Sequence, residues 1–330
     1  MRHDSLSAQC PYIRGLCRLR LAVIKVEYLP VVRKASLLLA LVVLLGGALL
    51  GCRSGGGAAT VEGQPQPPSS RAIENKGSDT MVNLALAWAE RYQQLHPEVR
   101  IAVTGGGSGT GIAALINGTV DIANASRAIK EEEIEEARAN GIEPVEHIVA
   151  RDAIAVVVHP DNPVDALTLQ QISDIYSGKI TNWRQVGGED RPIVRLSRET
   201  NSGTHVYFLE AVVRLGQKDN HTLFSPDTLL LPSSEGISAE VRQNPNAIGY
   251  DGLGYVTDDM KVIAVGASPE GPFWLPSVET VNNGLYPVAR DLYMYTAGEP
   301  TGLVLEYLTW ILTPEAQEIV RALGFVPIKE

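Results

Sequence analysis

Cysteine is almost absent from this chain of 330 residues, and its three copies, Cys10, Cys17 and Cys52, all lie near the beginning. A chain processed before Cys52 would therefore have no pair left for an internal disulfide. Histidine is also rare, with six scattered copies that show no metal-ligand spacing. Without a disulfide, the processed chain must depend on its hydrophobic cores for folding. The length suits about two domains.

The nucleotide-binding motifs are missing as well. The glycine-rich stretch TGGGSGTGIAALIN (104–117) has no lysine in its turn, so it is not a P-loop. Thr110 or Ile112 stands where the dinucleotide fingerprint needs its third glycine. The nucleophile elbow Gly-x-Ser-x-Gly fails too, because Thr110 follows Gly-Gly-Ser-Gly. A nucleotide enzyme or a metal enzyme is poorly supported.

Basic residues are outnumbered, with 28 Lys and Arg against 38 Asp and Glu. Residues 1–51 hold seven of the basic and two of the acidic residues, which leaves 21 against 36, or a formal charge of −15, in the remainder. Such a surface repels nucleic acid and anionic lipid. An anion could be bound only by local groups in a recessed site.

Long hydrophobic runs are limited to one segment near the N-terminus. The basic pair Arg33-Lys34 precedes an apolar run, 35–50, that is short for a membrane span and normal for a signal peptide. The run ends in Leu-Leu-Gly-Cys, which resembles the bacterial lipobox. A core helix or a simple anchor helix is the alternative. We expect a lipoprotein signal peptide over 1–51, lipidation of Cys52, a flexible Gly/Pro/Ser tether over 52–70, and a location on the outer face of the cell membrane or in the periplasm.

After the tether, apolar β-type runs alternate with helical patterns, which predicts an α/β protein with largely parallel sheets. Helices are expected at 80–95, 109–117, 131–139, 168–176, 203–215, 235–243, 301–312 and 314–323. Strands are expected at 99–104, 120–124, 153–158, 193–196, 247–250, 261–265 and 291–296.

Three of the expected helices begin in the same way. Each entrance combines small residues, which allow close backbone approach, with hydroxyls that can donate hydrogen bonds at the positive end of a helix dipole. Capping alone would explain any single entrance, but three together favour a free tetrahedral oxyanion shared among them. The candidate residues are Ser78 and Thr80; Ser108, Gly109 and Thr110; and Ser202, Gly203 and Thr204.

Two arginines follow strand-like segments near these entrances. Arg127 and Arg198 could each offer a bidentate, charge-assisted contact to an oxyanion. The alternative is surface pairing with Glu131, Glu132 or Glu199.

The ordered motifs GSDTM, GGGSGTGIAAL, VDIANASR, IYSGKITNW, SGTHVYF, AIGY, YPVARDLYMYT and GFVPI closely resemble the PstS-like phosphate-binding proteins, the substrate receptors of a bacterial phosphate ABC transporter. The resemblance covers about residues 74–328. It implies an α/β, two-lobed periplasmic-binding-protein fold of type II, in which each lobe has a mixed, mostly parallel sheet and two hinge strands join the lobes. We assign 71–152 and 256–330 to lobe I and 153–255 to lobe II, with crossings near Ile148–Val157 and Ala247–Val256. The expected partners are inorganic phosphate and a permease; no cofactor and no enzyme activity are expected, and the protein should be a monomer.

The resemblance also implies that Ser78, Thr80, Ser108, Gly109, Thr110, Arg198, Ser202, Gly203 and Thr204 contact the anion. One position departs from the family. Well-known members carry an aspartate, the acceptor of the hydrogen phosphate proton, where this chain has Arg127. Glu199, Asp79, Asp121 or a backbone carbonyl could accept that proton instead, and selectivity against sulfate or arsenate stays open.

Two other functions remain as alternatives. One is a phosphate sensor or adhesin that keeps the fold without transport. The other is a phosphatase or serine esterase using Ser108 or Ser202, although no histidine or metal motif is present to activate either serine.

Overall fold

The computed structural model describes residues 71–328, which belong to one compact unit of the chain. The expected signal peptide, lipidation site Cys52 and tether lie outside the described residues. The strands are β1 (Arg71–Gly77), β2 (Val99–Thr104), β3 (Ile122–Ala125), β4 (Pro144–Val158), β5 (Ala166–Thr168), β6 (Val194–Arg198), β7 (Leu229–Leu231), β8 (Ala247–Gly252), β9 (Lys261–Gly266), β10 (Phe273–Trp274) and β11 (Ala289–Ala297). The α-helices are α2 (Val82–Leu95), α3 (Ser108–Ile116), α4 (Glu131–Ala139), α5 (Leu169–Tyr176), α6 (Gly203–Phe208), α7 (Ser234–Gln243), α8 (Val278–Asn282), α9 (Gly302–Ile311) and α10 (Pro314–Ala322). Short helical turns add η1 (Asp79–Met81), η2 (Trp183–Val186), η3 (Leu209–Val213, a π-helix) and η4 (Leu253–Tyr255).

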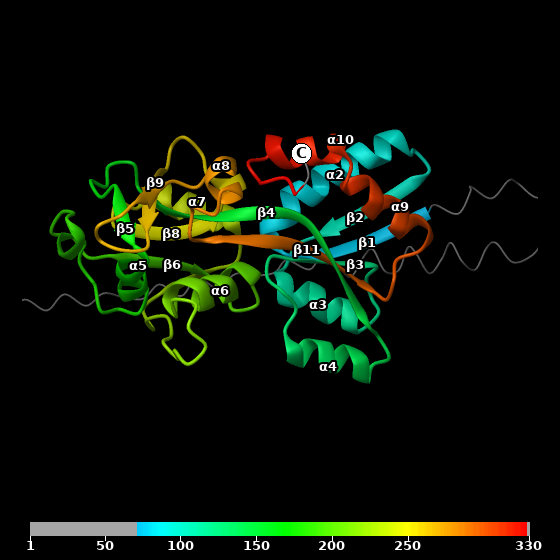
Figure 1. The fold of residues 1–330 in the computed structure, drawn as a ribbon, viewed down its shortest axis with the longest axis horizontal. Helices are drawn as coiled ribbons and strands as arrows, with labels where there is room; N and C mark the ends of the chain where they lie inside the picture. Colours follow the sequence, from blue (N-terminus) through cyan, green and yellow to red (C-terminus); the bar gives the residue numbers. More distant parts are fainter. Residues whose placement is uncertain (1–70, 329–330) are drawn as a thin grey trace, which may run out of the picture. The chain divides into compact units, whose positions relative to one another are not determined.

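The strands pair in the order β2-β1-β3-β11-β4-β8-β6-β7, with β9 joined to β4, β5 and β10 (Figure 1). β1 is parallel to β2 and β3, and β6 is parallel to β7 and β8. The pairings of β4 and β11 are antiparallel. The predicted α/β class is confirmed, with parallel winding in each half and antiparallel strands at the junction.

Two long strands connect the halves of the sheet. β4 pairs with β11 as far as Ala153, and from Ile154 onward it pairs with β8. We call lobe I the half built on β1, β2 and β3, and lobe II the half built on β5 to β10. β4 passes through both, and β11 returns the chain to lobe I (Figure 1).

The second crossing lies further along the chain than the sequence suggested. Tyr255 does pack into the lobe I core, but the chain then returns to lobe II, where β9 pairs with β4 and β5. Val281 and Tyr286 also belong to the lobe II core. The final crossing begins at Ala289 in β11, so the boundary near 256 is corrected to 289. The boundary was placed too early because the glycine-rich bend at 252–254 has the sequence pattern expected of a crossing between lobes.

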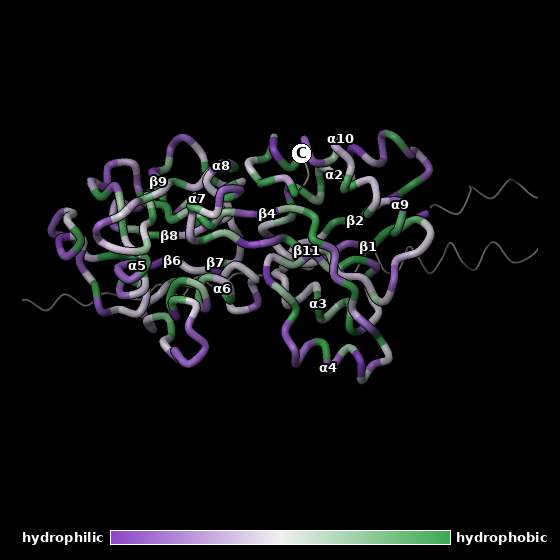
Figure 2. Tube along the Cα trace, viewed as in Figure 1, coloured by the Kyte–Doolittle hydropathy of each residue, from purple (hydrophilic) through white to green (hydrophobic). Residues whose placement is uncertain are grey.

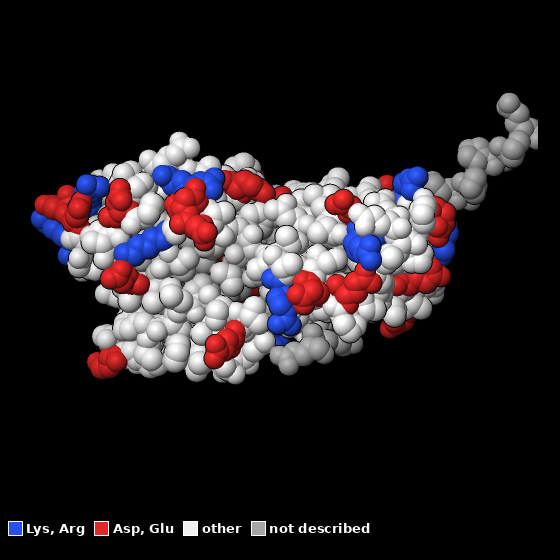
Figure 3. Space-filling view, turned by 90° about the horizontal axis from the view of Figure 1, so that it is seen from above, with Lys and Arg blue, Asp and Glu red and all other residues white. Residues whose placement is uncertain are grey.

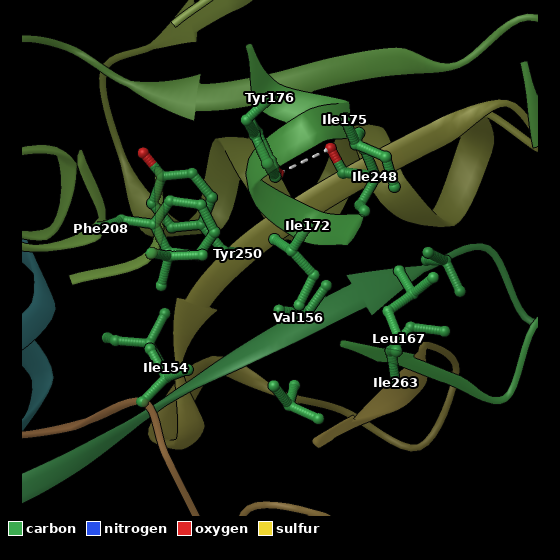
Figure 4. Close-up of a cluster of buried hydrophobic side chains, with 14 of the residues drawn as sticks. Ile154, Val156, Leu167, Ile172, Ile175, Tyr176, Phe208, Ile248, Tyr250 and Ile263 are labelled. Carbon is green, nitrogen blue, oxygen red and sulfur yellow. Dashed lines mark hydrogen bonds between the residues drawn. The ribbon is translucent and has the colours of Figure 1, made fainter. Parts of the chain in front are cut away.

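Each lobe has its own hydrophobic core. The lobe I cluster includes Trp88, whose indole N–H donates to the carbonyl of Ala316 at 2.9 Å. In lobe II, the rings of Phe208 and Tyr250 are stacked with centroids 3.6 Å apart, and the Tyr176 hydroxyl donates to the carbonyl of Ile248 (Figure 4). Aromatic burial of this kind makes a large contribution to core stability.

Local sequence signals set several element boundaries. α10 begins with Thr313 as N-cap, its hydroxyl accepting from the N–H of Ala316, then Pro314, and ends before Gly324, whose φ is 79°. The expected apolar face of α2 is buried at Met81, Leu84, Trp88 and Tyr92, whereas Leu95 at the helix end is exposed.

The hydropathy of the trace follows this packing: the packed helix α3 is largely hydrophobic, whereas α4 is largely hydrophilic (Figure 2). On the face in Figure 3, acidic and basic side chains are interspersed. Among the described residues, no helix is both long and apolar enough to cross a membrane.

Candidate anion-binding site

All three helix entrances follow strands, and they converge at the junction of the lobes. η1 and α3 follow β1 and β2 in lobe I, and α6 follows β6 in lobe II. Ligands of open α/β folds bind beyond the carboxyl ends of the strands, which is where these entrances lie. Gly106 and Gly107 have φ values of 115° and 93°, so only glycine suits the turn that leads into α3.

Lobe I contributes a buried cluster of hydroxyls. The Ser78 hydroxyl donates to Ser126 Oγ at 2.9 Å, and the Oγ atoms of Ser108 and Ser126 are 3.3 Å apart. The N–H of Ser126 also donates to Ser108 Oγ at 3.0 Å. Ser126 was not predicted from the sequence, although it directly follows β3 as Ser108 follows the turn after β2.

Lobe II meets this cluster at the start of α6. The hydroxyl oxygens of Thr80 and Thr204, one from each lobe, are 2.7 Å apart. A Cβ atom added to Gly203 would lie 2.3 Å from Ser108 Oγ and 2.6 Å from Ser126 Oγ. Ser202 caps α6, its hydroxyl accepting from the Thr204 N–H at 3.2 Å. Six of the predicted residues are therefore brought together.

Gly109 and Thr110 lie at the same junction with their N–H groups already bonded. The Gly109 N–H donates to the carbonyl of Asn201 at 3.0 Å, and the Thr110 N–H donates to that of Gly107 at 3.1 Å. The Thr110 hydroxyl donates to Gly106 at 2.6 Å. An anion could use these N–H groups only by displacing their present acceptors.

Arg198 reaches the junction from the end of β6, and its side chain is only 1% exposed. Its Nη2 donates to Asp79 Oδ2 at 2.8 Å, and its Nη1 donates to Ser234 Oγ at 2.9 Å. The other oxygen of Asp79 accepts from the N–H of Gly106 at 3.0 Å. Asp79 thus links η1, the α3 turn and the lobe II arginine.

Arg127 pairs with Glu133, which is none of the three glutamates considered from the sequence. Its guanidinium donates to both oxygens of Glu133, at 2.7 and 2.6 Å, and to the carbonyl of Ala128. Burial alone would raise the pKa of Glu133, but bonds from Arg127 and the Lys130 N–H outweigh it and lower the pKa. Glu133 on α4 turns inward and pairs with Arg127, so Arg127 would have to share or exchange this partner to bind an anion, and the expected contact stays a prediction.

Another buried arginine at the junction, Arg290 on β11, was not predicted. Its Nη2 lies 3.0 Å from Thr204 Oγ1, 3.4 Å from Thr80 Oγ1 and 3.0 Å from Asp152 Oδ2. Its place in the motif YPVARDLYMYT gave no signal, since only the crossing of β11 beside the entrances brings it there.

Two carboxylates beside these arginines are fully buried. Burial raises the pKa of Asp152, although the positive charge of Arg290 acts to lower it. Burial also raises the pKa of Asp251 to about 7, although Arg198 and the Ser234 hydroxyl favour its charged form. The Ser234 hydroxyl links Arg198 to Asp251: it accepts a hydrogen bond from the guanidinium and donates one to the carboxylate at 2.8 Å.

The arrangement is suited to binding rather than to nucleophilic catalysis. Ser108 and Ser202 are hydrogen-bonded to Ser126 and to the Thr204 N–H, and not to a histidine. The buried His205 contacts Ser197 in lobe II instead. Within residues 71–328 there is no group of three His, Cys, Asp or Glu side chains that could hold a metal ion.

Two α/β lobes joined by long strands, with polar donors gathered where they meet, define a type II periplasmic-binding-protein fold. The model of the PBP superfamily domain matches residues 62–315. The phosphate-binding protein PstS of Pseudomonas aeruginosa is 32% identical over 273 residues, covering 78% of this chain and 83% of its own. The PstS of Bacillus subtilis is 32% identical over 263 residues, covering 79% and 82%. The chain therefore belongs to the PBP superfamily and, within it, is a PstS-like protein.

A solved structure agrees with this assignment. A substrate-binding protein from Clostridium perfringens, ascribed to phosphate ABC transport and solved with bound phosphate, superposes with a TM-score of 0.70. It is 34% identical, and the match covers 78% of this chain and all of that one.

Proposed function

We propose that this protein is an extracytoplasmic receptor that binds inorganic phosphate between its lobes and delivers it to an ABC permease. The relatives named above are phosphate-binding proteins. The observation that carries the proposal is the convergence of hydroxyl donors from both lobes with the buried guanidinium of Arg198. Phosphate oxygens accept hydrogen bonds from such donors, and a guanidinium can bond two of them at once.

Phosphate entry requires the lobes to separate. The Thr80 and Thr204 oxygens are 2.7 Å apart, and Gly203 lies directly against the Ser108 and Ser126 hydroxyls. A tetrahedral anion between these groups would replace their mutual hydrogen bonds. β4 and β11 are the strands about which such a hinge motion would occur.

Asp79 is the best-placed acceptor for the proton of hydrogen phosphate. Its carboxylate lies against Arg198, whereas Asp121 accepts from the N–H of Glu74 and Glu199 is exposed. An ionised carboxylate is an acceptor only, so it favours an anion that carries a proton. Sulfate has none, which would give phosphate selectivity without an aspartate at position 127.

Delivery outside the cytoplasm follows from the proposed export signal. We propose that lipidation of Cys52 anchors the receptor to the membrane, and that it acts as a monomer beside its permease. Labelling with a radioactive fatty acid tests the anchor: label should attach to the wild-type chain and be lost from Cys52→Ala.

Titration calorimetry of the purified protein with phosphate, sulfate and arsenate tests the binding function. Tight phosphate binding that excess sulfate does not disturb is the expected result. Absence of phosphate binding would contradict the proposal. Hydrolysis of p-nitrophenyl phosphate that disappears in Ser108→Ala or Ser202→Ala would favour the enzyme alternative.

A further inference from the structure

Arg290 is the buried cation that touches hydroxyls of both lobes. Its Nη2 contacts Thr80 of lobe I and Thr204 of lobe II, and it also pairs with Asp152 on β4. The side chain is 3% exposed, and its partner Asp152 is fully buried. The guanidinium therefore lies at the point where the two lobes meet.

Most of its hydrogen-bonding capacity is unused. Nε and Nη1 of Arg290 are buried and have no hydrogen-bond partner among the described residues. The Tyr207 ring lies 5.4 Å from its Cζ and covers one face. A buried guanidinium normally has its N–H groups satisfied, so these free donors call for an acceptor that the protein itself does not provide.

Arg290 borders a cavity at the seam between the lobes. A cavity of about 350 Å³ is bordered by Arg290, by Tyr207 of lobe II and by Tyr293 of lobe I. Arg127 and Lys130 also line it, as do Glu210 and Asp291. Opening of the lobes at this seam would expose Arg290 together with the Thr80 and Thr204 hydroxyls.

We propose that Arg290 is a second cationic contact for the bound anion, contributed by the crossing strand β11. When the anion separates the Thr80 and Thr204 hydroxyls, it takes the place beside Nη2 that they now fill, and the unpartnered Nη1 of the same guanidinium can donate to a second oxygen of the anion. Arg198 then binds it from lobe II and Arg290 from the hinge. This inference rests on the proposed function and extends it, because two guanidinium groups favour a doubly charged oxyanion.

A purely structural role for Arg290 is the competing explanation. Asp152 is fully buried, and an arginine that only neutralised it would make the same ion pair. The double variant Arg290→Gln/Asp152→Asn separates the two roles, since it removes both charges and leaves neutral side chains that can still hydrogen-bond. If Arg290 served only Asp152, removal of both charges would restore phosphate binding.

The test is titration of the purified protein with inorganic phosphate. We expect wild type to bind, and Arg290→Gln and the double variant each to bind at least tenfold more weakly. Arg195→Gln is the matched control, because Arg195 is also 3% exposed and paired with an aspartate, but lies at Asp227 away from the hydroxyls. It should bind within about threefold of wild type.

Each outcome decides one question. Phosphate binding by the double variant within about threefold of wild type would overturn the role of Arg290 as a contact. Failure of wild type to bind phosphate would instead overturn the proposed function. Thermal unfolding identifies variants that fail to fold. If they do, Arg290→Lys replaces them, because it keeps the charge beside Asp152 but loses the planar guanidinium. This variant should bind phosphate about tenfold more weakly than wild type, and unchanged affinity would overturn the inference.

Discussion

Arg198 of lobe II and Asp79 of lobe I form an ion pair across the lobe junction, with Nη2 and Oδ2 2.8 Å apart. The guanidinium is 1% exposed and the carboxylate 18%, so the pair is largely removed from water. Asp79 therefore already supplies an oxyanion to Arg198. A bound phosphate must share this guanidinium with Asp79 or displace it, which makes the pair central to both affinity and selectivity.

Replacing Arg198 should abolish tight phosphate binding. Arg198→Gln removes a charged donor, and each hydrogen bond to a charged group contributes about 1.5–3 kcal/mol. The loss of two such bonds corresponds to an affinity at least about 100-fold weaker by calorimetry. Arg195→Gln, on the same strand, is the control; equal affinity of Arg198→Gln and wild type would refute the assignment.

Replacing Asp79 should change selectivity. In Asp79→Asn, the amide can donate a hydrogen bond, so an anion without a proton is no longer disfavoured. We expect sulfate affinity to increase at least about tenfold and the ratio of phosphate to sulfate affinity to fall. Competition titrations measure this ratio, with Asp121→Asn as the control. Unchanged sulfate affinity would show that another group accepts the proton.

A side chain at Gly203 should prevent closure. The added Cβ of Gly203→Ala would meet Ser108 Oγ at 2.3 Å, closer than any normal contact. We expect phosphate affinity to fall at least about tenfold while the separate lobes stay folded. Small-angle scattering with and without phosphate checks closure directly. Gly236→Ala is the matched control, since its nearest atom, Ser233 Oγ, lies at 3.4 Å; a ligand-induced contraction in Gly203→Ala equal to that of wild type would contradict the prediction.

Arg127 should matter for stability rather than for binding. Arg127→Gln leaves Glu133, 18% exposed, without its bidentate partner. We expect destabilisation of about 1–3 kcal/mol in urea denaturation and phosphate affinity within about threefold of wild type. Arg127→Gln/Glu133→Gln should recover much of the stability. A loss of phosphate affinity as large as that of Arg198→Gln would contradict this prediction and show that Arg127 takes part in binding.

Asp251 should make stability fall as the pH rises toward neutrality. Burial raises its pKa from 3.8 to about 7, so between these values the folded protein keeps a proton that the unfolded chain has released. The free energy of unfolding therefore decreases from about pH 4 to pH 7, and Asp251 contributes most below that range. Asp251→Asn cannot release the proton and should lose less stability between pH 5 and pH 8 than wild type. Urea denaturation of wild type and Asp251→Asn at each pH measures the two free energies of unfolding, and identical pH dependence of the two proteins would contradict the raised pKa.

Local features of the fold could be predicted from the sequence because they depend on neighbouring residues. The Thr313-Pro314 start of α10, the buried stripe of α2 and the glycine turn before α3 all follow from capping, helical periodicity and permitted backbone angles. The strand at 71–77 was not predicted, and the strand at 144–158 was predicted only over 153–158. Charged residues interrupt the apolar pattern in the missed parts, which only sheet pairing makes evident.

The sequence by itself determined the α/β class, the three polar helix entrances and the family, because these depend on short motifs and on local periodicity. Only the tertiary structure decided the partners of the arginines. Arg198 and Asp79 are 119 residues apart in sequence, and Arg290 and Thr80 are 210 apart. Charge pairing and burial act through space, so no local pattern could show that β11 brings Arg290 between the lobes.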